Sequence, residues 1–325
     1  MKIAVFSAKS YDIAMFNKIN DGSFNYQIDY FRDHLKEDTT KLANGYDAIC
    51  IFVNDLVNRK IAEDLAKNGV KLVALRCAGF NNVDLKALED NNLGLVRVPS
   101  YSPHAIAEHA MALILSLNRK IHRAYMRTRD GNFSLHGLQG FDLYGKTAGI
   151  IGTGKIAKAL IAILKGFGMN VLAYDPFPDE ASAKNLGFTY CSLDEIYKNA
   201  DVISLHCPLT DDTHYIINEN SIAKIKKGVM IINTGRGKLI HTEDLIKGLK
   251  SGKVGYAGLD VYEEESELFF TDKSDFILND DILARLLTFN NVIVTSHQAF
   301  FTQEAVSNIV TTTLQNIKDF FLNLK

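Results

Sequence analysis

The segment from Thr147 to Asp175 constrains the fold of this chain more than any other part of the sequence. It starts with an apolar run typical of a buried strand, passes through Gly152-Thr-Gly154 into a helical pattern, and ends with a second apolar run before Asp175. A glycine turn that opens a helix presents backbone N–H groups and the positive end of the helix dipole to a phosphate. This order of strand, turn, helix, strand and acid predicts a βαβ unit that binds a dinucleotide. The alternative is a glycine turn in an ordinary βαβ unit.

Each residue of the turn has a separate task in this prediction. Gly152 permits the tight turn, and Gly154 lets the backbone approach a pyrophosphate where a Cβ would interfere. Lys155 and Ile156 line the turn through their backbone. Asp175 lies 21 residues after Gly154, where its carboxylate can accept hydrogen bonds from both ribose hydroxyls. A carboxylate there repels a 2′-phosphate, and the next five residues contain no Arg or Lys, so the sequence favours NAD over NADP as the cofactor.

Length and charge exclude several classes of function. At 325 residues the chain is longer than one typical domain and fits two. Its formal net charge of −2 gives no electrostatic reason to expect nucleic acid or an anionic membrane as a partner, although a small anionic substrate needs only a local cation. The first apolar run is too short for a signal peptide, and the most apolar helical segment, 110–117, is too short to span a membrane.

The cysteines point to a reducing compartment. They are Cys50, Cys77, Cys191 and Cys207. None is spaced as a pair of metal ligands, and all lie in or beside apolar runs typical of strands. This pattern favours buried, reduced thiols, so we expect a cytoplasmic protein without a metal site.

Strand-like and helical patterns alternate along nearly the whole chain, which predicts two doubly wound parallel α/β units of the Rossmann type. The expected strands cover residues 3–7, 26–31, 48–53, 72–76, 94–98, 148–151, 171–174, 189–191, 202–206, 229–233, 255–261 and 292–295. A boundary at 99–103 predicts a substrate domain formed by residues 1–100 and 298–325, and an NAD-binding domain formed by residues 101–297. We expect a helix from Pro103 to about Arg123, and a final helix from about Thr302 to Leu322 that returns to the first domain. Two connections suit a hinge that closes over an active-site cleft.

Six short motifs follow one another from residue 102 onward. They are Ser-Pro-His-Ala-Ile-Ala-Glu-His at 102–109, Gly-Thr-Gly-Lys-Ile at 152–156, His-Cys-Pro at 206–208, Asn-Thr-Gly-Arg-Gly at 233–237, Gly-Leu-Asp-Val-Tyr-Glu-Glu-Glu at 258–265 and Ser-His-Gln-Ala-Phe at 296–300. In kind and order they resemble the D-2-hydroxyacid dehydrogenase family, and within it most closely the D-lactate dehydrogenases. The first hundred residues match the family more loosely.

Reducing a 2-keto acid requires a cation for the carboxylate, an acid for the carbonyl oxygen and a group that keeps this acid charged, besides the hydride of NADH. Arg236, in a glycine-flanked turn, offers the planar fork that binds a carboxylate by two parallel hydrogen bonds. His297 follows a strand, and an imidazole can give and take a proton near neutral pH. By the family's pattern Glu265 hydrogen-bonds His297 and favours its protonated form. The alternatives are a surface arginine, a structural histidine and a solvated glutamate in the acidic run 263–265.

The resemblance implies further contacts to the cofactor. Asp260 follows a strand and is expected to orient the nicotinamide carboxamide, or else to cap a turn as an ordinary strand-end acid. Cys207 and Pro208 belong to a loop that the family uses for adenosine and nicotinamide contacts, and Pro208 stiffens this loop. The remaining candidates for cofactor binding are Thr213, Thr234 and Gly235.

Candidates for substrate binding are also expected in the first domain. Ala78 and Gly79 follow a strand and can present backbone N–H groups to the substrate carboxylate. Tyr101 can add a hydroxyl, or it can serve in packing between domains. Phe52 and Phe300 are expected to wall the C3 side of the substrate, which leaves room for a methyl group and favours pyruvate. Each of these two rings can equally belong to the plain core.

The resemblance thus implies reversible, NADH-dependent reduction of pyruvate to D-lactate. The first alternative is a family member that acts on a longer 2-keto acid, glyoxylate or hydroxypyruvate, and the second is a non-catalytic protein that senses NAD(H). The family's habit implies a homodimer or homotetramer. An apolar face on the helix that begins at Pro103 agrees with burial against another subunit or with cover within one chain. This face comprises Ala105, Ile106, Ala110, Met111, Leu113, Ile114 and Leu117.

Overall fold

A computed structural model describes residues 1–265 and 268–323 of the chain. The chain forms two compact units: unit 1 comprises Met1–Ser102 with the C-terminal segment from Phe301, and unit 2 comprises Pro103–Phe300. Each unit contains one parallel sheet, of five strands in unit 1 and of seven in unit 2. The expected α/β fold with two doubly wound sheets is confirmed. No helix within the described ranges has the length and apolar character needed to cross a membrane.

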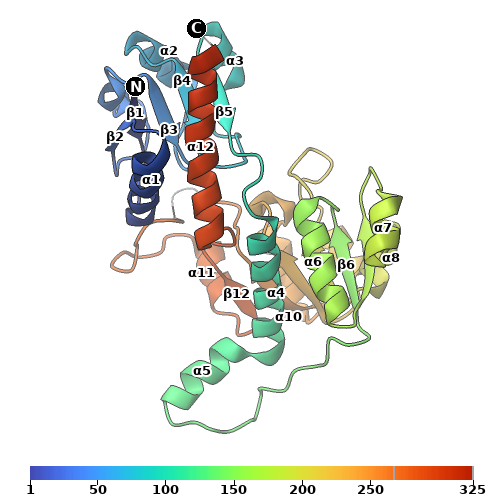
Figure 1. The fold of residues 1–325 in the computed structure, drawn as a ribbon. Coiled ribbons are helices and arrows are strands. Elements are labelled where there is room, and N and C mark those ends of the chain that lie inside the picture. The colour runs from blue at the N-terminus through green and yellow to red at the C-terminus, as the bar shows by residue number, and fades with distance from the viewer. Residues whose placement is uncertain (266–267, 324–325) are drawn as a thin grey trace. The chain divides into compact units, whose positions relative to one another are not determined.

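Unit 1 is a sheet with helices on both faces, in the strand order β2-β1-β3-β4-β5. The strands are β1 (Lys2–Val5), β2 (Gln27–Tyr30), β3 (Ala48–Ile51), β4 (Leu72–Leu75) and β5 (Gly94–Arg97). The helices are α1 (Ser10–Ser23), the short η1 (Thr40–Ala43), α2 (Arg59–Lys67), α3 (Leu85–Asp90) and α12 (Gln303–Asn323). Alternate residues of β1 point to opposite faces of the sheet, and each face has its own apolar core. Helices α1 and α12, which lie side by side in Figure 1, cover one face. Helices α2 and α3 cover the other.

Unit 2 has the strand order β12-β11-β10-β9-β6-β7-β8. The strands are β6 (Thr147–Ile151), β7 (Asn170–Tyr174), β8 (Thr189–Tyr190), β9 (Val202–Leu205), β10 (Val229–Asn233), β11 (Val254–Leu259) and β12 (Val292–Val294). The helices are α4 (Pro103–Arg119), α5 (Ile121–Arg129), α6 (Lys155–Gly166), α7 (Glu180–Leu186), α8 (Leu193–Asn199), α9 (Glu219–Lys224), η2 (Gly237–Leu239), α10 (Thr242–Ser251) and α11 (Asp281–Leu287). All expected strands are present, with ends that differ by at most two residues. Because the sheet is parallel, the residues that follow its strands gather at one edge.

The helix expected from Pro103 to Arg123 is wrong in extent. It begins at Pro103 but ends at Arg119, because Lys120 adopts a left-handed conformation with φ 51° and a separate helix, α5, follows. Tertiary contacts fix this break: the buried Asn118 side chain donates to Phe141 O at 2.7 Å and accepts from Phe141 N at 2.8 Å.

The apolar face of α4 is covered within unit 2. Five of its expected members pack into the core formed with α6 and the sheet; they are Ala110, Met111, Leu113, Ile114 and Leu117. For these residues the structure shows cover within one chain, so they give no support for a subunit interface.

Candidate active site

The glycine turn after β6 is open beside the start of α6. Gly152 has φ +90°, and a Cβ at this position would lie 2.5 Å from the backbone nitrogen of Cys207, so only glycine lets the two loops pack together. Gly154 precedes α6 as its N-cap without any side-chain cap, and a Cβ there would meet nothing within 4 Å. Open space therefore lies before the uncapped N–H groups at the start of α6, where Lys155 and Ile156 are located. This arrangement fits the phosphates of a dinucleotide.

Asp175 lies directly after β7 and is tied to the same turn. Its Oδ2 accepts hydrogen bonds from the backbone N–H of Thr153 at 2.7 Å and from the Thr153 hydroxyl at 2.9 Å, and its Oδ1 accepts one from Phe177 N at 2.9 Å. Burial on its own raises the pKa of this carboxyl, but the hydrogen bonds from Phe177 and Thr153 outweigh it and lower the pKa below its ordinary value. Asp175 is thus held as a charged acceptor beside the turn.

His297 and Glu265 form a direct pair. His297 Nδ1 lies 2.8 Å from Glu265 Oε1, and the other oxygen of Glu265 accepts a hydrogen bond from Tyr262 N at 2.9 Å. His297 has φ +54°, a conformation that a non-glycine residue adopts only at some cost in energy. The bond from His297 N to Asp260 O, 2.7 Å long, helps to hold this conformation.

Asp260 is fully buried, and the segment after β12 surrounds its carboxylate. It accepts hydrogen bonds from the Thr295 hydroxyl at 2.5 Å, Gln298 N at 2.9 Å and Ala299 N at 2.8 Å, and His109 Nε2 lies 3.4 Å away. Burial on its own raises the pKa of the Asp260 carboxyl, but the hydrogen bonds from His109, Thr295 and the two backbone N–H groups outweigh it, so the pKa lies below its ordinary value. The geometry is that of an acid capping a turn, the alternative considered from the sequence. Contact with the nicotinamide carboxamide stays a prediction.

Arg236 lies in a turn whose shape is set by Asn233 and Gly237. The Asn233 side chain accepts from Gly235 N at 3.0 Å and donates to Arg236 O at 2.8 Å. A Cβ on Gly237 would lie 2.1 Å from the carbonyl carbon and oxygen of Tyr262, so the turn packs directly on the segment that leads to Glu265.

The three catalytic candidates leave neighbouring strands at one edge of the unit 2 sheet. Arg236, Glu265 and His297 follow β10, β11 and β12, which are adjacent in the sheet. Backbone pairing continues beyond the strand ends, with Asp260 N donating to Asn233 O at 2.9 Å and His297 N donating to Asp260 O. The structure thus brings together the elements that carry the three side chains, and their roles stay predictions.

The loop after β9 contains the remaining cofactor candidates. His206 Nε2 lies 2.8 Å from the Ser204 hydroxyl, and burial lowers its pKa to about 4, which leaves the imidazole neutral. Burial raises the pKa of the adjacent Cys207 thiol to about 11, so it is not ionised. The Thr213 hydroxyl donates to Pro208 O at 2.6 Å and so braces the loop itself.

Thr234 provides an independent sign of a ligand. It precedes Gly235 in the turn after β10, and its buried hydroxyl makes no hydrogen bond to any described residue. A buried hydroxyl without a partner is costly unless a ligand or water satisfies it. The buried hydroxyl of Thr234 is therefore compatible with a bound cofactor, and its contact with the cofactor stays a prediction.

Known proteins share both the sequence pattern and this architecture. A family model described as D-isomer specific 2-hydroxyacid dehydrogenase, NAD binding domain, matches residues 111–299. The chain belongs to the D-isomer specific 2-hydroxyacid dehydrogenases. The predicted family is confirmed, and with it an NAD-dependent enzyme.

This dehydrogenase is similar to its relatives over nearly its whole length. It is 53% identical over 319 residues to the D-lactate dehydrogenase of Escherichia coli strain K12, a match that covers 98% of this chain and 96% of that protein. A solved structure described as the pyruvate reductase of Chlamydomonas reinhardtii superposes with a TM-score of 0.95 at 44% identity, covering 99% and 97% of the two chains. The NAD complexed form of the enzyme from Lactobacillus delbrueckii ssp. bulgaricus superposes with a TM-score of 0.80 at 30% identity, covering 99% and 98%.

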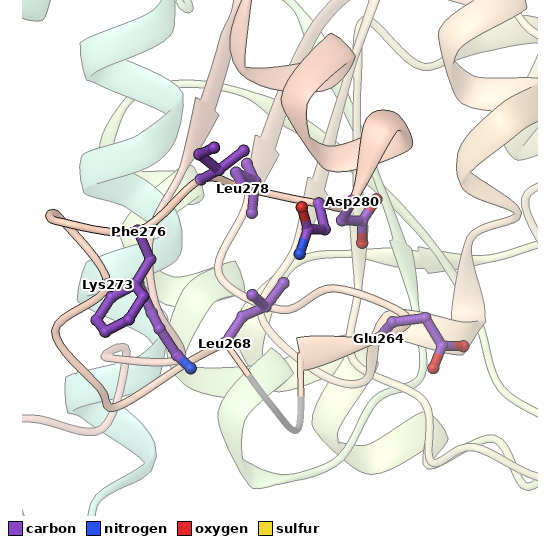
Figure 2. Close-up of a pocket in the computed structure, with 8 residues that line it drawn as sticks. Glu264, Leu268, Lys273, Phe276, Leu278 and Asp280 are labelled. Carbon is purple, nitrogen blue, oxygen red and sulfur yellow. The ribbon is translucent and has the colours of Figure 1, made fainter.

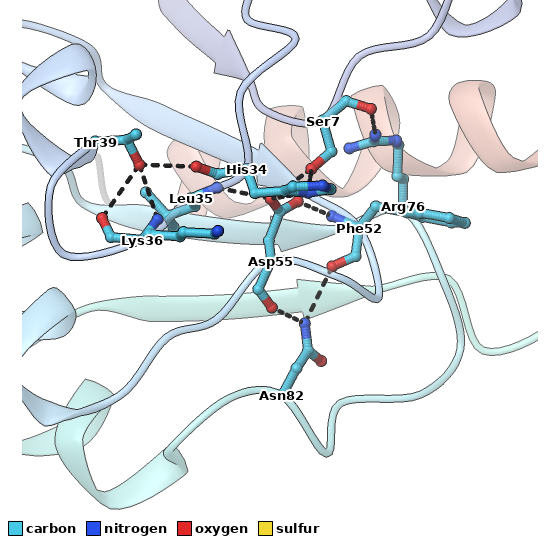
Figure 3. A network of polar contacts seen from close by, with 9 residues as sticks. All are labelled: Ser7, His34, Leu35, Lys36, Thr39, Phe52, Asp55, Arg76 and Asn82. Carbon is cyan, nitrogen blue, oxygen red and sulfur yellow. Dashed lines mark hydrogen bonds and ion pairs between the residues drawn. The ribbon is translucent and has the colours of Figure 1, made fainter. Parts of the chain in front are cut away.

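In unit 1 of the dehydrogenase, Phe52 contacts three polar side chains, those of Asp55, Arg76 and Asn82 (Figure 3). Its backbone N–H donates to the buried Asp55 carboxylate at 2.6 Å, its carbonyl accepts from the Asn82 side chain at 3.1 Å, and the Arg76 guanidinium lies 5.0 Å from its ring centroid. Asp55 also accepts from the Ser7 hydroxyl at 2.6 Å. Phe52 is only half-buried, so it lies at the rim of the unit 1 core.

The backbone carbonyls of two other substrate candidates accept hydrogen bonds from side chains within unit 1. Ala78 O accepts from Arg97 Nη1 at 2.7 Å, and Tyr101 O accepts from the Asn308 side chain at 2.8 Å. Gly79 lies next to Ala78 after β4, and Phe300 is buried in unit 2. Contact between any of these residues and a substrate stays a prediction.

A pocket of about 520 Å³ in unit 2 does not coincide with the predicted site. Figure 2 shows the side chains that line it. Its lining comprises Glu264, Leu268, Lys273, Phe276, Ile277, Leu278, Asn279 and Asp280. None of the lining residues is one of the catalytic candidates, although Glu264 precedes Glu265 in the chain. Within the described ranges, no group of His, Cys, Asp and Glu side chains is arranged to hold a metal ion.

Proposed function

We propose that this dehydrogenase reduces pyruvate to D-lactate with NADH, and that the reaction is reversible. The observation that carries the proposal is the 2.8 Å pair of His297 and Glu265 at the same sheet edge as the Arg236 turn. The names of two relatives, a D-lactate dehydrogenase and a pyruvate reductase, support the same substrate.

Each of the three residues has one task in the proposed reaction. Bound NADH supplies the hydride. The Arg236 guanidinium binds the substrate carboxylate through two parallel hydrogen bonds. His297 uses Nδ1 to bond Glu265, which leaves Nε2 to donate a proton to the carbonyl oxygen; in the reverse direction Nε2 accepts it. Glu265 fixes the ring orientation and stabilises the positive charge of the protonated imidazole.

The cofactor would be held by residues of the turn after β6 and of the segments that follow neighbouring strands. Backbone N–H groups of Lys155 and Ile156 would bind the pyrophosphate, and Asp175 would accept from the ribose hydroxyls. Thr234 has a buried hydroxyl to offer. The loops after β9, β10 and β11 are proposed to complete the cofactor site. Their contributing residues are Cys207, Pro208, Thr213, Gly235 and Asp260.

Pyruvate is proposed over larger keto acids because two aromatic rings are assigned to the C3 side. Phe52 and Phe300 would leave room there for a methyl group. Tyr101 and the backbone of Ala78 and Gly79 are proposed to contribute to binding the carboxylate end. The alternative substrates are a longer 2-keto acid, glyoxylate and hydroxypyruvate.

Steady-state rates with NADH and a panel of these keto acids test the proposal. We expect the highest kcat/KM with pyruvate and D-lactate as the product, as measured with a stereospecific lactate assay. The Arg236→Gln variant should raise the KM for pyruvate by about 100-fold, because it loses a charge-assisted bidentate contact. A higher kcat/KM for another keto acid, or L-lactate as the product, would contradict the assignment.

We further propose that the dehydrogenase is a cytoplasmic homodimer or homotetramer. None of the nine residues of α5 is buried within the chain, and Ile121, Tyr125 and Met126 are all more than half exposed. Such a short helix is marginally stable without a packing partner, so a second subunit would stabilise it. Light scattering coupled to size-exclusion chromatography measures the mass, and a monomer would contradict the proposal.

A further inference from the structure

We propose that Thr153, Tyr190 and Asp179 make this dehydrogenase select NADH over NADPH, by fixing the Asp175 carboxylate and by neutralising Lys158. None of these four residues, Thr153, Lys158, Asp179 and Tyr190, belongs to those that the glycine-turn pattern singles out. The proposal concerns the cofactor alone and is independent of which 2-keto acid is reduced.

Thr153, Asp175 and Tyr190 come from the ends of three adjacent strands. Thr153 follows β6, Asp175 follows β7, and Tyr190 ends β8. Thr153 is buried and engages Asp175 Oδ2 with both its N–H and its hydroxyl, while the same hydroxyl lies 2.9 Å from Tyr190 OH. Tyr190 OH in turn lies 3.0 Å from the backbone nitrogen of Asp179. The four residues form one continuous chain of hydrogen bonds.

The chemistry of the two end groups fixes the direction of every bond in this chain. A backbone N–H can only donate, so Asp179 N donates to Tyr190 OH. An ionised carboxylate can only accept, so the single hydroxyl proton of Thr153 points to Asp175. Tyr190 must then donate its own proton to Thr153. With every proton assigned, the chain is polarised toward Asp175 and its members strengthen one another.

This arrangement allows Asp175 neither to rotate nor to take up a proton without loss of hydrogen bonds. Oδ2 receives two donors from Thr153, whereas Oδ1 receives one, from Phe177 N. Oδ1 therefore has acceptor capacity left for ribose hydroxyls. A 2′-phosphate at the same place would meet a full negative charge that cannot move aside.

Asp179 forms an ion pair with Lys158, the cation that would otherwise help a 2′-phosphate to bind. Lys158, on α6, is close enough to Asp175 to lower the pKa of its carboxyl. Its ammonium group, however, lies 2.6 Å from Asp179 Oδ2 and is engaged in an ion pair. The same Asp179 caps α7, because its Oδ1 accepts from Ser182 N at 3.0 Å. One residue thus aligns Tyr190 through its backbone and holds Lys158 through its side chain.

Three conservative variants separate the contributions of Thr153, Tyr190 and Asp179 to cofactor selectivity. Thr153→Val removes the hydroxyl but keeps the branched shape and the backbone N–H. Tyr190→Phe removes the hydroxyl but keeps the ring, whose edge packs against Phe188 with 5.1 Å between the centroids. Asp179→Asn keeps an N-cap side chain, since Asn caps helices as well as Asp, and it keeps the backbone N–H, but it releases Lys158.

The readout is the ratio of the dissociation constants of NADPH and NADH, measured by fluorescence titration of the full-length protein. We expect this ratio to fall by about tenfold in Thr153→Val and Asp179→Asn and by about threefold in Tyr190→Phe, because one charge-assisted contact is lost in each of the first two and a neutral one in the third. Thr153→Val should have no further effect once Asp175 is replaced by Ala, since Thr153 acts through that carboxylate.

Matched controls in unit 2 remove similar contacts elsewhere. Tyr197→Phe deletes a buried tyrosine hydroxyl that donates to Ile216 O at 3.1 Å, and Asp194→Asn deletes the exposed ion pair with Lys224 at 2.8 Å. Both controls should leave the ratio at the wild-type value, and thermal melts should show all variants folded. An unchanged ratio in Thr153→Val and Tyr190→Phe would overturn the role of the chain. An unchanged ratio in Asp179→Asn would overturn the role of Lys158, and an equal change in the controls would overturn both.

Discussion

At the residue scale, one ring nitrogen of His297 is committed to a fixed partner. Nδ1 is bonded to Glu265 at 2.8 Å, and Tyr262 N holds the other oxygen of Glu265 at 2.9 Å, so neither the ring nor the carboxylate rotates freely. We expect His297→Gln to lower kcat by about 10²- to 10⁴-fold, because Gln has no proton to exchange near neutral pH. Binding of NADH should be unaffected. Stopped-flow turnover and NADH titration measure the two quantities separately.

His136→Gln is the control for this prediction, since His136 is exposed on the loop after α5. It should retain wild-type turnover. A His297→Gln variant that also retains it would remove His297 from the chemistry. A variant that loses NADH binding together with turnover would assign His297 to the cofactor instead.

Single residues also show where sequence reasoning stops. Gly152, Gly154 and Asp175 were predictable because each belongs to a pattern with a known physical purpose. Thr153 and Tyr190 were not, since a threonine between two glycines and a tyrosine in a two-residue strand have no such pattern of their own. Their importance depends on the pairing of β7 with β6 and β8, which brings residues distant in sequence within hydrogen-bond distance.

At the element scale, the two turns that carry site residues use glycine for opposite reasons. A Cβ on Gly154 would meet nothing within 4 Å, whereas one on Gly237 would lie 2.1 Å from the Tyr262 backbone. Gly154→Ala should therefore leave the melting temperature unchanged and weaken NADH binding, because the methyl group occupies the space before α6. Gly237→Ala should lower the melting temperature by several degrees and abolish most turnover, because the Arg236 turn must move away from Tyr262. Differential scanning fluorimetry and NADH titration distinguish the two variants, and equal melting temperatures would contradict this account of Gly237.

The segment after β12 depends on the buried Asp260 carboxylate, which predicts how stability changes with pH. Because the pKa of Asp260 is lowered in the folded protein, its ionised form stabilises the fold above the unfolded pKa of about 3.9, and this contribution is lost as the pH falls through the folded value. Asp260→Asn should lower the melting temperature clearly at pH 7. The gap to wild type should narrow below about pH 4. A gap that stays constant between pH 7 and pH 3.5 would show that the charge of Asp260 does not stabilise the segment.

Elements differ in how far the sequence determines them. The strands were predictable to within two residues because buried parallel strands are continuous apolar runs with β-branched residues. The end of α4 was not predictable, since residues 119–123 contain neither Gly nor Pro. Lys120 takes its left-handed conformation where Asn118 bonds Phe141 and where the Lys120 side chain bonds Gln139 O. Those partners lie about twenty residues further along the chain, beyond the reach of local patterns.

At the scale of the whole molecule, the two units differ in how the chain forms them. Unit 2 is one uninterrupted segment, Pro103–Phe300, and two apolar cores lie on the two faces of its sheet. Unit 1 is interrupted, because α12 contributes Val310, Leu314 and Ile317 to the core beside α1. Removing α12 would therefore expose an apolar face of the unit 1 sheet.

Because unit 2 is formed by one uninterrupted segment, we expect residues 103–300 expressed alone to fold and to bind NADH. The turn at Gly152, the acid Asp175 and the pair of His297 and Glu265 all lie within this segment, and each is held by contacts to other residues of the same segment. NADH at about 100 times its dissociation constant should stabilise the segment by about 2.7 kcal/mol, provided that only the folded form binds. Turnover should be absent, because the proposed substrate contact Phe52 belongs to unit 1. A segment that folds but gains no stability from NADH would show that unit 2 alone does not form the cofactor site.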